Sequence, residues 1–371
     1  MVILSEQKTR RWPLIAPPAA WLVFVVLHRV FSGRVWWWGA LELVPPFMFL
    51  LVPILGLGLA ALARPVRWPV AALAVVALVL GASLGGLNPA ALGHRPPAAP
   101  AGAINVFSWN TWYWDQPGDT GATEPPPGGT AAATVDGFYQ YLREQNADVY
   151  LLQEYLYLHD DIPVLVNGED RLRQEFPGYQ IATAGELVTM SRLPVVGVRK
   201  LSLLPYLPAG RDLDMPGGPE LHDFYTDKLL RTDIDVHGQV MSFYNAHIPT
   251  PVEPNPSSFR PSAMSEAHDT RQATLRALAA DLAGNPRPAM LSGDFNTSPA
   301  MGLLRMVPDR LRDVSSALRS VYPTSWDDRS LRLWRIDWVF ATPEVTVNQY
   351  RLISSRGQSD HRGQSLVLSL S

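Results

Sequence analysis

The uneven distribution of apolar residues restricts the fold of this chain more than any other feature. Residues 13–86 contain three apolar stretches, at about 13–31, 36–63 and 68–86. The third is uninterrupted and has about 20 residues, the length that crosses a bilayer. The first two contain prolines, which membrane helices tolerate. Tryptophans lie at the ends of the stretches, as in an aromatic belt: Trp12, Trp36, Trp37, Trp38 and Trp68. We therefore predict a bundle of about three transmembrane helices in residues 1–86.

Charged residues around these stretches predict the orientation of the spans. The side of the N-terminus carries five basic residues and the opposite side two: Lys8, Arg10, Arg11, Arg64 and Arg67 against Arg29 and Arg34. The positive-inside rule then places the region after residue 86 outside the cell membrane. If the first stretch does not span, that region returns to the side of the N-terminus. Glu42, inside the second stretch, is expected to reach water at the boundary of its span.

Residues 87–103, LNPAALGHRPPAAPAGA, are typical of a Pro/Ala/Gly linker. The following residues, 104–371, have the length of a single α/β domain. From residue 101 onward, 23 Lys and Arg stand against 32 Asp and Glu, a net charge of −9. Because binding to nucleic acid needs a basic face, this charge makes a nucleic-acid partner unlikely. The chain has no cysteine, which excludes disulfides, thiol catalysis and Cys-ligated metals.

Strand-like and helix-like segments alternate after the linker, which predicts an α/β fold. Helices are expected at 135–147 and about 262–282, and a Pro/Gly-rich surface loop at 115–130. The pair His237-Gly238 separates two strand-like runs and predicts a hairpin. The strands are expected at 104–110, 148–154, 187–196, 229–238, 239–249, 335–342, 345–353 and 363–371, with one more ending at Asp294.

Polar residues stand at the ends of these strands, where a core would not place them. They are Asn110 in SWN, Glu154 in LLQE, Asn245 and His247 in YNAH, Asp294 and Asn296 in GDFN, Asp337 in RID, and Asp360 and His361 in SDHRG. Each alone has a structural explanation, and GDFN alone fits an Asx-turn. Together, carboxylates, carboxamides and imidazoles suit a hard cation and proton transfer on a phosphate ester. Strand ends are also where α/β sheets bind ligands.

The ordered series SWN, QE, SRLPV, NAH, GDFN, RID and SDH resembles the endonuclease/exonuclease/phosphatase superfamily over residues 104–371. That superfamily comprises metal-dependent phosphohydrolases, including DNase I-like nucleases, sphingomyelinases and inositol phosphatases. The resemblance implies a four-layer α/β sandwich with two central sheets, and Mg²⁺ as the cofactor, with Mn²⁺ as the alternative. It implies three metal ligands: Glu154, Asn110 and Asp360.

The same resemblance implies a role for each catalytic residue. His361 transfers a proton, and Asp337 orients its imidazole. Asp294 positions or activates the attacking water, and Asn296 steadies that water and the phosphate. His247 contacts a phosphate oxygen or protonates the leaving group. Arg192 and Arg271 also match recurring positions, and we expect both to be structural.

The layout, membrane spans followed by an outward-facing domain of this superfamily, is similar to bacterial membrane proteins associated with resistance to teicoplanin-type glycopeptides. This similarity implies lipid-linked cell-wall pyrophosphates, such as undecaprenyl pyrophosphate, as substrates. We therefore expect a multi-pass plasma-membrane phosphohydrolase with an extracytoplasmic active site, in contact with the lipid bilayer. The alternatives are an anchored extracellular nuclease or other phosphodiesterase, and a non-catalytic phosphate-binding module. The cluster Trp109, Trp112, Tyr113 and Trp114 either reaches the membrane interface or packs under a neighbouring loop.

Overall fold

The computed structural model describes residues 12–62, 67–93, 95–114, 135–159, 162–166, 168–252, 260–328 and 331–370. Two six-stranded sheets form the centre of the α/β domain. The first sheet has the order β15 (Val345–Ile353), β16 (Gly363–Leu370), β1 (Ile104–Asn110), β2 (Val149–Gln153), β6 (Leu187–Ser191), β5 (Gln180–Ala184). The second has the order β11 (Arg312–Asp313), β14 (Asp337–Ala341), β10 (Ala289–Asp294), β9 (Gln239–His247), β8 (Asp227–Val236), β7 (Val195–Ser202). The predicted loop at 115–130 lies outside the described residues.

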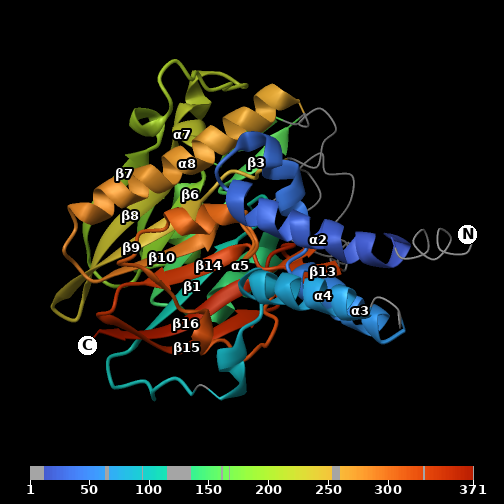
Figure 1. Ribbon diagram of the computed structural model, residues 1–371. Coiled ribbons are helices and arrows are strands. Elements are labelled where there is room, and N and C mark those ends of the chain that lie inside the picture. Colours follow the sequence, from blue (N-terminus) through green and yellow to red (C-terminus); the bar gives the residue numbers. More distant parts are fainter. Residues whose placement is uncertain are drawn as a thin grey trace, which may run out of the picture.

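The two sheets pack face to face, and helices cover their outer faces. Val106 and Leu151 of the first sheet meet Phe243 and Met290 of the second in the core between the sheets. Outside the first sheet lie α5 (Val135–Gln145) and α6 (Glu169–Glu175), and outside the second lies α8 (Pro261–Ala283), which crosses it in Figure 1. These four layers confirm the predicted α/β sandwich.

Shorter elements complete the domain. Two strand pairs are β3 (Leu156–His159) with β4 (Ile162–Leu165) and β12 (Trp326–Asp328) with β13 (Leu331–Trp334). The remaining helices are α7 (His222–Thr226), η3 (Pro89–Leu92), η4 (Leu204–Tyr206), η5 (Pro219–Leu221), η7 (Gly302–Met306) and η8 (Ser315–Ala317).

Several local predictions are confirmed. Strands β8 and β9 form the expected hairpin, with positive φ at His237 and Gly238 in its turn. Helix α8 begins and ends within one residue of its predicted bounds. Trp109 and Trp114 are fully buried against α5, so packing is the correct alternative for these two members of the aromatic cluster.

The N-terminal region consists of α2 (Trp12–Phe31), η1 (Trp36–Leu43), α3 (Met48–Leu62), α4 (Arg67–Gly81) and η2 (Ala82–Leu84). Two helices, Pro13–Phe31 and Arg67–Leu84, are long and apolar enough to cross a membrane. The second predicted span is divided into η1 and α3, which meet at 64° and count as a third span only if taken together. Pro45 and Pro46 lie at the break. Proline lacks the N–H donor of a helical hydrogen bond and disfavours helix in the residue before it, so these two prolines account for the interruption. Figure 1 shows α2, α3 and α4 projecting from one side of the sandwich.

The end of α2 is attached to the loop that follows β10. The Ser32 hydroxyl accepts a hydrogen bond from Gly302 N at 2.6 Å. Trp38 Nε1 donates to His28 Nδ1 at 3.1 Å, which leaves His28 Nε2 as the nitrogen facing Ala300 O at 2.9 Å. A Cβ on Gly302 would lie 2.5 Å from the carbonyl carbon of Ser32. The two backbones therefore approach as closely as only glycine allows.

Glu42 and Asn88 strengthen this attachment. Glu42 is buried, and its Oε1 accepts the Gly33 N–H at 2.5 Å, so the expectation that it reaches water is wrong. The Asn88 amide donates to three carbonyls near η8, including Ser315 O at 2.9 Å. The segment after the last apolar helix is thus fixed to the α/β domain at its start, and the helices and the sandwich are joined by buried polar contacts.

Candidate active site

The predicted polar residues gather where the central strands of both sheets end. Strands β1 and β2 run parallel and place Asn110 opposite Gln153, directly before Glu154. In the second sheet, β9 and β10 run parallel and pair His247 with Asp294. The antiparallel neighbour β14 begins with Asp337 opposite the same Asp294. A hydrogen bond from Asn110 of the first sheet to Asp294 of the second shows that these strand ends meet at one edge of the sandwich.

The Asp294 carboxylate is the centre of the group. Its Oδ2 accepts hydrogen bonds from Asn110 Nδ2 at 2.9 Å and from Asn296 Nδ2 at 3.3 Å. Two imidazoles face the same oxygen, with His361 Nε2 at 3.6 Å and His247 Nε2 at 3.7 Å. The other oxygen, Oδ1, accepts the Asn296 backbone N–H at 2.7 Å, which is an Asx-turn. The turn and the polar cluster therefore coexist at this residue.

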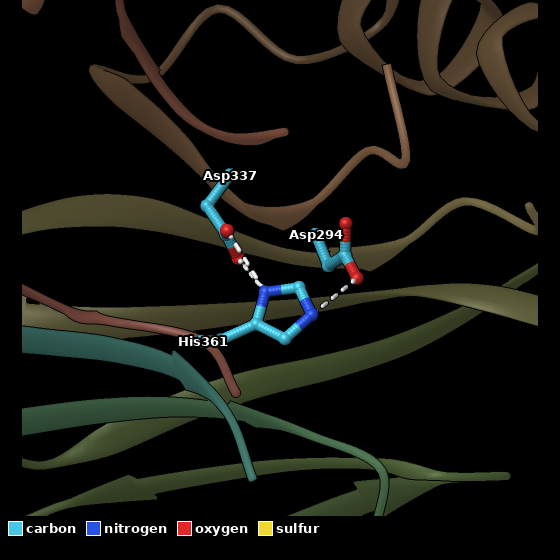
Figure 2. A group of neighbouring side chains, drawn as sticks. All are labelled: Asp294, Asp337 and His361. Carbon is cyan, nitrogen blue, oxygen red and sulfur yellow. Dashed lines mark hydrogen bonds and ion pairs between the residues drawn. The ribbon is translucent and has the colours of Figure 1, made fainter. Parts of the chain in front are cut away.

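His361 and Asp337 form a buried dyad (Figure 2). Both oxygens of Asp337 lie at His361 Nδ1, at 2.9 and 3.1 Å, which directs Nε2 toward Asp294. The Ser325 hydroxyl oxygen accepts the backbone N–H groups of Ile336 and Asp337, each at 3.0 Å, and fixes the start of β14. The carboxylate thus sets the orientation of the ring, as expected from the RID and SDH motifs.

Glu154 and Asn110 are held by an unusual backbone. Asn110 Nδ2 donates to Glu154 Oε1 at 3.0 Å, and the Tyr113 N–H donates to Glu154 Oε2 at 3.0 Å. The Trp112 N–H donates to Asn110 Oδ1 at 2.9 Å. Glu154, Trp112 and Tyr113 have φ values of 63°, 52° and 61°, a region that such side chains rarely adopt. Strain of this kind concentrates at functional sites.

Asp360 provides a carboxylate oxygen that has no hydrogen-bond donor in the described part of the chain. Its Oδ2 accepts Trp326 Nε1 at 2.8 Å, while Oδ1 is buried and makes no hydrogen bond among the described residues. That oxygen lies 3.9 Å from His361 Nε2. A buried oxygen without a donor is costly unless a cation or water satisfies it.

Glu186 is a member of this site that the sequence did not reveal. It lies in the tight turn between β5 and β6, where an acid is usually solvated. Here it is buried, with Oε2 at 3.0 Å from His247 Nδ1 and Oε1 accepting Lys228 Nζ at 2.5 Å. His247 therefore has its own carboxylate, as His361 has Asp337. Only the fold brings this turn to β9, so no motif spacing signals it.

Three other residues singled out in the sequence have structural roles. Asn245 is buried between the sheets and donates to Leu152 O and Val188 O of the first sheet. Arg271, buried in α8, donates to Pro249 O, to Asn296 O at 3.2 Å and to Thr297 Oγ1 at 2.7 Å. It therefore ties together the loops after His247 and Asp294. Arg192 is bonded to Tyr179 and Asn146 at the surface.

Burial and neighbouring charges raise the pKa values of three carboxylates and two imidazoles of the site. Burial raises the pKa values of Glu154, Asp294 and Asp360, since water no longer stabilises the charged carboxylates. Burial also opposes charging of His247, but Glu186, Asp294 and Glu154 outweigh it and raise its pKa to about 9. Asp337, Asp294 and Asp360 likewise overcome burial and raise the pKa of His361 well above its usual value. Without a metal, both shifts favour the positively charged imidazolium form of the two rings.

The donor set fits a divalent cation. Oxygen atoms of Glu154, Asp360 and Asn110 are the kind of ligand that Mg²⁺ and Mn²⁺ take. The buried Asp360 oxygen without a hydrogen-bond donor is a position that a cation would satisfy. The buried group Asp294, Asp337 and His361 has ligand atoms within 4.8 Å of one another and could itself hold a metal ion. His361 Nδ1 is already bonded to Asp337, so this ring could offer only Nε2 to an ion.

The His247–Glu186 contact makes a specific prediction. In the metal-free protein, His247 is expected to titrate near pH 9. Replacing Glu186 with glutamine removes a carboxylate that raises this pKa, so the value is expected to fall by about one unit or more. NMR titration of labelled histidines measures it. Glu220→Gln, at an exposed position of η5, is the control and should leave the His247 titration unchanged. Equal curves for wild type and Glu186→Gln would contradict the contact.

Two central sheets covered by helices, with a polar site at the strand ends, define an α/β sandwich of the DNase I-like class, and the comparisons identify the family. The Endonuclease/Exonuclease/phosphatase family matches residues 93–361, and the chain belongs to it. Members of this family hydrolyse phosphate esters, which agrees with the resemblance of the motifs. No curated protein matches the chain.

Solved structures share the fold at low sequence identity. An endonuclease/exonuclease/phosphatase from Beutenbergia cavernae is 20% identical, with a TM-score of 0.50 and coverage of 72% of each chain. One from Bacteroides vulgatus is 17% identical, with a TM-score of 0.49, covering 72% of this chain and 99% of the other. A mannosyl-6-phosphatase from Bacteroides thetaiotaomicron is 16% identical, with a TM-score of 0.47, covering 72% and 100%. These likenesses concern the fold alone.

Proposed function

We propose that the protein is a membrane-anchored, metal-dependent phosphohydrolase whose substrate is a lipid-linked phosphate or pyrophosphate of the undecaprenyl pyrophosphate type. One observation carries the proposal: the loop that begins with Asn296 continues to Ala300 and Gly302, which are bonded to the end of α2. Because α2 is a candidate membrane span, the site lies beside the surface that this span would reach. A phosphate carried on a membrane lipid would be presented at that surface.

The proposed location is the plasma membrane, with the site outside the cytoplasm. The distribution of basic residues supports this orientation, because five lie on the side of the N-terminus and two on the other. Three successive spans cross the membrane in alternating directions. The α/β domain would therefore lie on the same side of the membrane as the end of α2, the start of α3 and the end of α4.

The proposed chemistry divides the residues by the charge they carry. Asp294 Oδ2, surrounded by four donors, would orient the attacking water and accept its proton. The protonated His361 and His247 would donate to phosphate oxygens or to the leaving oxygen, and Asn296 would steady the same phosphate. Asp337 and Glu186 keep the two rings charged and oriented. Glu154, Asp360 and Asn110 would hold the cation, which supplies Lewis-acid stabilisation of phosphate charge.

Phosphate release tests this assignment. Full-length protein in detergent with Mg²⁺ is offered undecaprenyl pyrophosphate, mannose 6-phosphate and plasmid DNA in parallel, with His361→Ala as the control. We expect release from the polyprenyl substrate, dependence on the divalent cation, and loss in the variant. Cleavage of DNA would favour the nuclease alternative, against which the charge of −9 argues. No turnover of any substrate would favour the phosphate-binding module.

A link to glycopeptide resistance rests on the layout of the chain. Cells producing the wild-type protein are expected to tolerate more teicoplanin than cells producing equal amounts of His361→Ala. Equal susceptibility of the two would remove resistance from the proposal while leaving the hydrolase intact.

A further inference from the structure

Three arginines from separate segments surround the end of α2. Arg29 belongs to the last turn of α2, Arg34 follows that helix, and Arg305 belongs to η7 of the α/β domain. All three are exposed. Arg305 donates to Ser32 O, and Arg34 Nη1 donates to Val30 O at 3.2 Å, so both guanidinium groups are fixed to the same turn of backbone. We call these three residues the arginine cluster.

No carboxylate forms an ion pair with the arginine cluster among the residues that the structure describes. Arg29 Nη1 is bonded to Leu80 O at 2.8 Å and to Ser83 Oγ at 3.1 Å, and the other two arginines are bonded to carbonyls. The acid that acts on Arg305 is Glu42, whose Oε1 is already held by Gly33. Each guanidinium has five N–H donors, so most of them remain available to a ligand.

The three guanidinium groups repel one another. Burial, together with the charges of Arg34 and Arg29, lowers the pKa of Arg305. The hydrogen bonds to the last carbonyls of α2 and α4 offset part of this repulsion, because helix C-termini stabilise cations. An anion bound between the side chains would offset more, and guanidinium groups match the geometry of phosphate.

The surroundings of the arginine cluster are those of a membrane surface. Below it, α2 exposes an apolar stripe at helical spacing: Val23, Val26, Leu27 and Val30. Trp37, half exposed, stands beside it in η1, as aromatic residues do at the level of lipid headgroups. The stripe fits hydrocarbon, and the cluster directly above it lies where headgroup phosphates would be.

An apolar pocket lies along the same helices. It is lined by residues of α2, α3 and α4, among them Pro18, Trp21, Pro53, Gly56, Ala74 and Ala77. Trp21 precedes Arg29 by about 12 Å along α2, and Ala77 precedes Leu80 by about 4.5 Å along α4, at 1.5 Å per residue. A hydrocarbon chain would occupy this pocket while its phosphate is at the arginine cluster, which favours a lipid over a soluble phosphate.

We propose that Arg29, Arg34 and Arg305 form a binding site for the phosphate of an anionic phospholipid headgroup, separate from the catalytic site. The proposal rests on the membrane insertion of α2 given under the proposed function, and not on the identity of the hydrolysed substrate. Because Arg305 belongs to the α/β domain and the other two arginines to the helical region, one headgroup would join both parts. The bound lipid would thereby hold the loop after β10, and with it Asn296, against the membrane.

Lipid selectivity in nanodiscs tests the proposal without any turnover. The full-length protein is reconstituted with spin-labelled phosphatidylglycerol or phosphatidylcholine, and the protein-bound fraction of each label is measured by electron paramagnetic resonance. We expect a preference of about fivefold or more for phosphatidylglycerol, since each basic residue near a membrane surface contributes about a factor of five. The triple variant R29Q/R34Q/R305Q should lose the preference. Arg34→Gln alone, which removes one exposed hydrogen bond to Val30 O, should reduce it if the triple variant does not fold.

Two controls make the outcome decisive. The variant R173Q/R351Q/R356Q removes the same charge from exposed positions of the α/β domain and should keep the preference. Asp294→Asn should keep it too, so a failure of the hydrolase proposal does not affect this test. Equal preference in wild type and R29Q/R34Q/R305Q, or equal loss in the control triple, would overturn the site. Displacement of the lipid by millimolar inorganic phosphate would reassign it to a soluble anion.

Discussion

Replacing Asp294 with asparagine is expected to lower phosphate release about 1000-fold, the middle of the range for loss of a general base. In the wild type, Oδ2 accepts two amide donors and faces two protonated imidazoles. An asparagine amide placed there would present N–H to donors and would remove the charge between the rings. Turning the amide the other way would place its NH₂ group against the Asn296 backbone N–H, which in the wild type donates to Oδ1 at 2.7 Å.

Asp313→Asn is a matched control for this prediction. Its Oδ1 also accepts the backbone N–H of the residue two positions later, Ser315, at 2.8 Å, so it forms the same kind of turn away from the site. Activity is measured as initial rate with Mg²⁺, and folding by thermal unfolding. If Asp294 served only its turn, the two variants would have similar activity. A near-normal rate for Asp294→Asn would therefore restore the purely structural interpretation of GDFN.

The sequence predicted the site well where its residues end buried strands. Asn110, His247 and Asp294 close runs of alternating or continuous apolar residues, and a polar group at that point has few purely structural uses. Since parallel strands end at the same edge, their convergence follows from the pattern of strands. The order of the motifs then added Glu154, Asp360 and His361. The structure brings all eight predicted residues to one edge of the sandwich, while their individual roles stay predictions.

Other parts of the site depend on contacts that no local pattern encodes. Glu186 looks like an ordinary turn acid until β5 and β6 are placed beside His247. In the sequence, prolines were the only sign of the bend between η1 and α3. They did not predict it, because membrane helices also tolerate proline. The attachment of Ser32 to Gly302 joins residues about 270 positions apart, and their close approach depends on glycine in a loop that resembles any other. The sequence therefore gave no sign of the joint between the end of α2 and the α/β domain.

Gly293→Ala is expected to have the largest effect on stability, lowering the free energy of unfolding by about 4 kcal/mol or more, since backbone strain and overpacking are among the few mechanisms that reach such values. Gly293 has a φ of 148°, which favours glycine strongly. A Cβ at this position would lie 2.8 Å from the carbonyl carbon of Ala246 and closer still to its oxygen. Ala246 cannot retreat easily, because its neighbour Asn245 is bonded to Leu152 O and Val188 O in the other sheet.

Gly284→Ala provides the comparison, since the same methyl group is added where it fits. Gly284 ends α8 with φ −90°, and its Cβ would meet nothing closer than Asp281 O at 3.7 Å. The free energy of unfolding of that variant should lie within about 0.5 kcal/mol of the wild-type value or slightly above it. Thermal and urea unfolding of the full chain in detergent, followed by near-UV circular dichroism, compares the two. Similar midpoints for both variants would contradict the close approach at Gly293.

The position of Gly293 explains why this strain matters for function. Strands β9 and β10 pair Gly293 with Ala246 and, one residue later, Asp294 with His247. The absence of a side chain at Gly293 allows the two strand ends to come together, and this approach brings the His247 imidazole to 3.7 Å from Asp294 Oδ2. A residue with a Cβ would separate the carboxylate from one of its two histidines even if the domain folded. Any Gly293→Ala protein that remains folded is therefore expected to lose activity as well, whereas Gly284→Ala is expected to keep it.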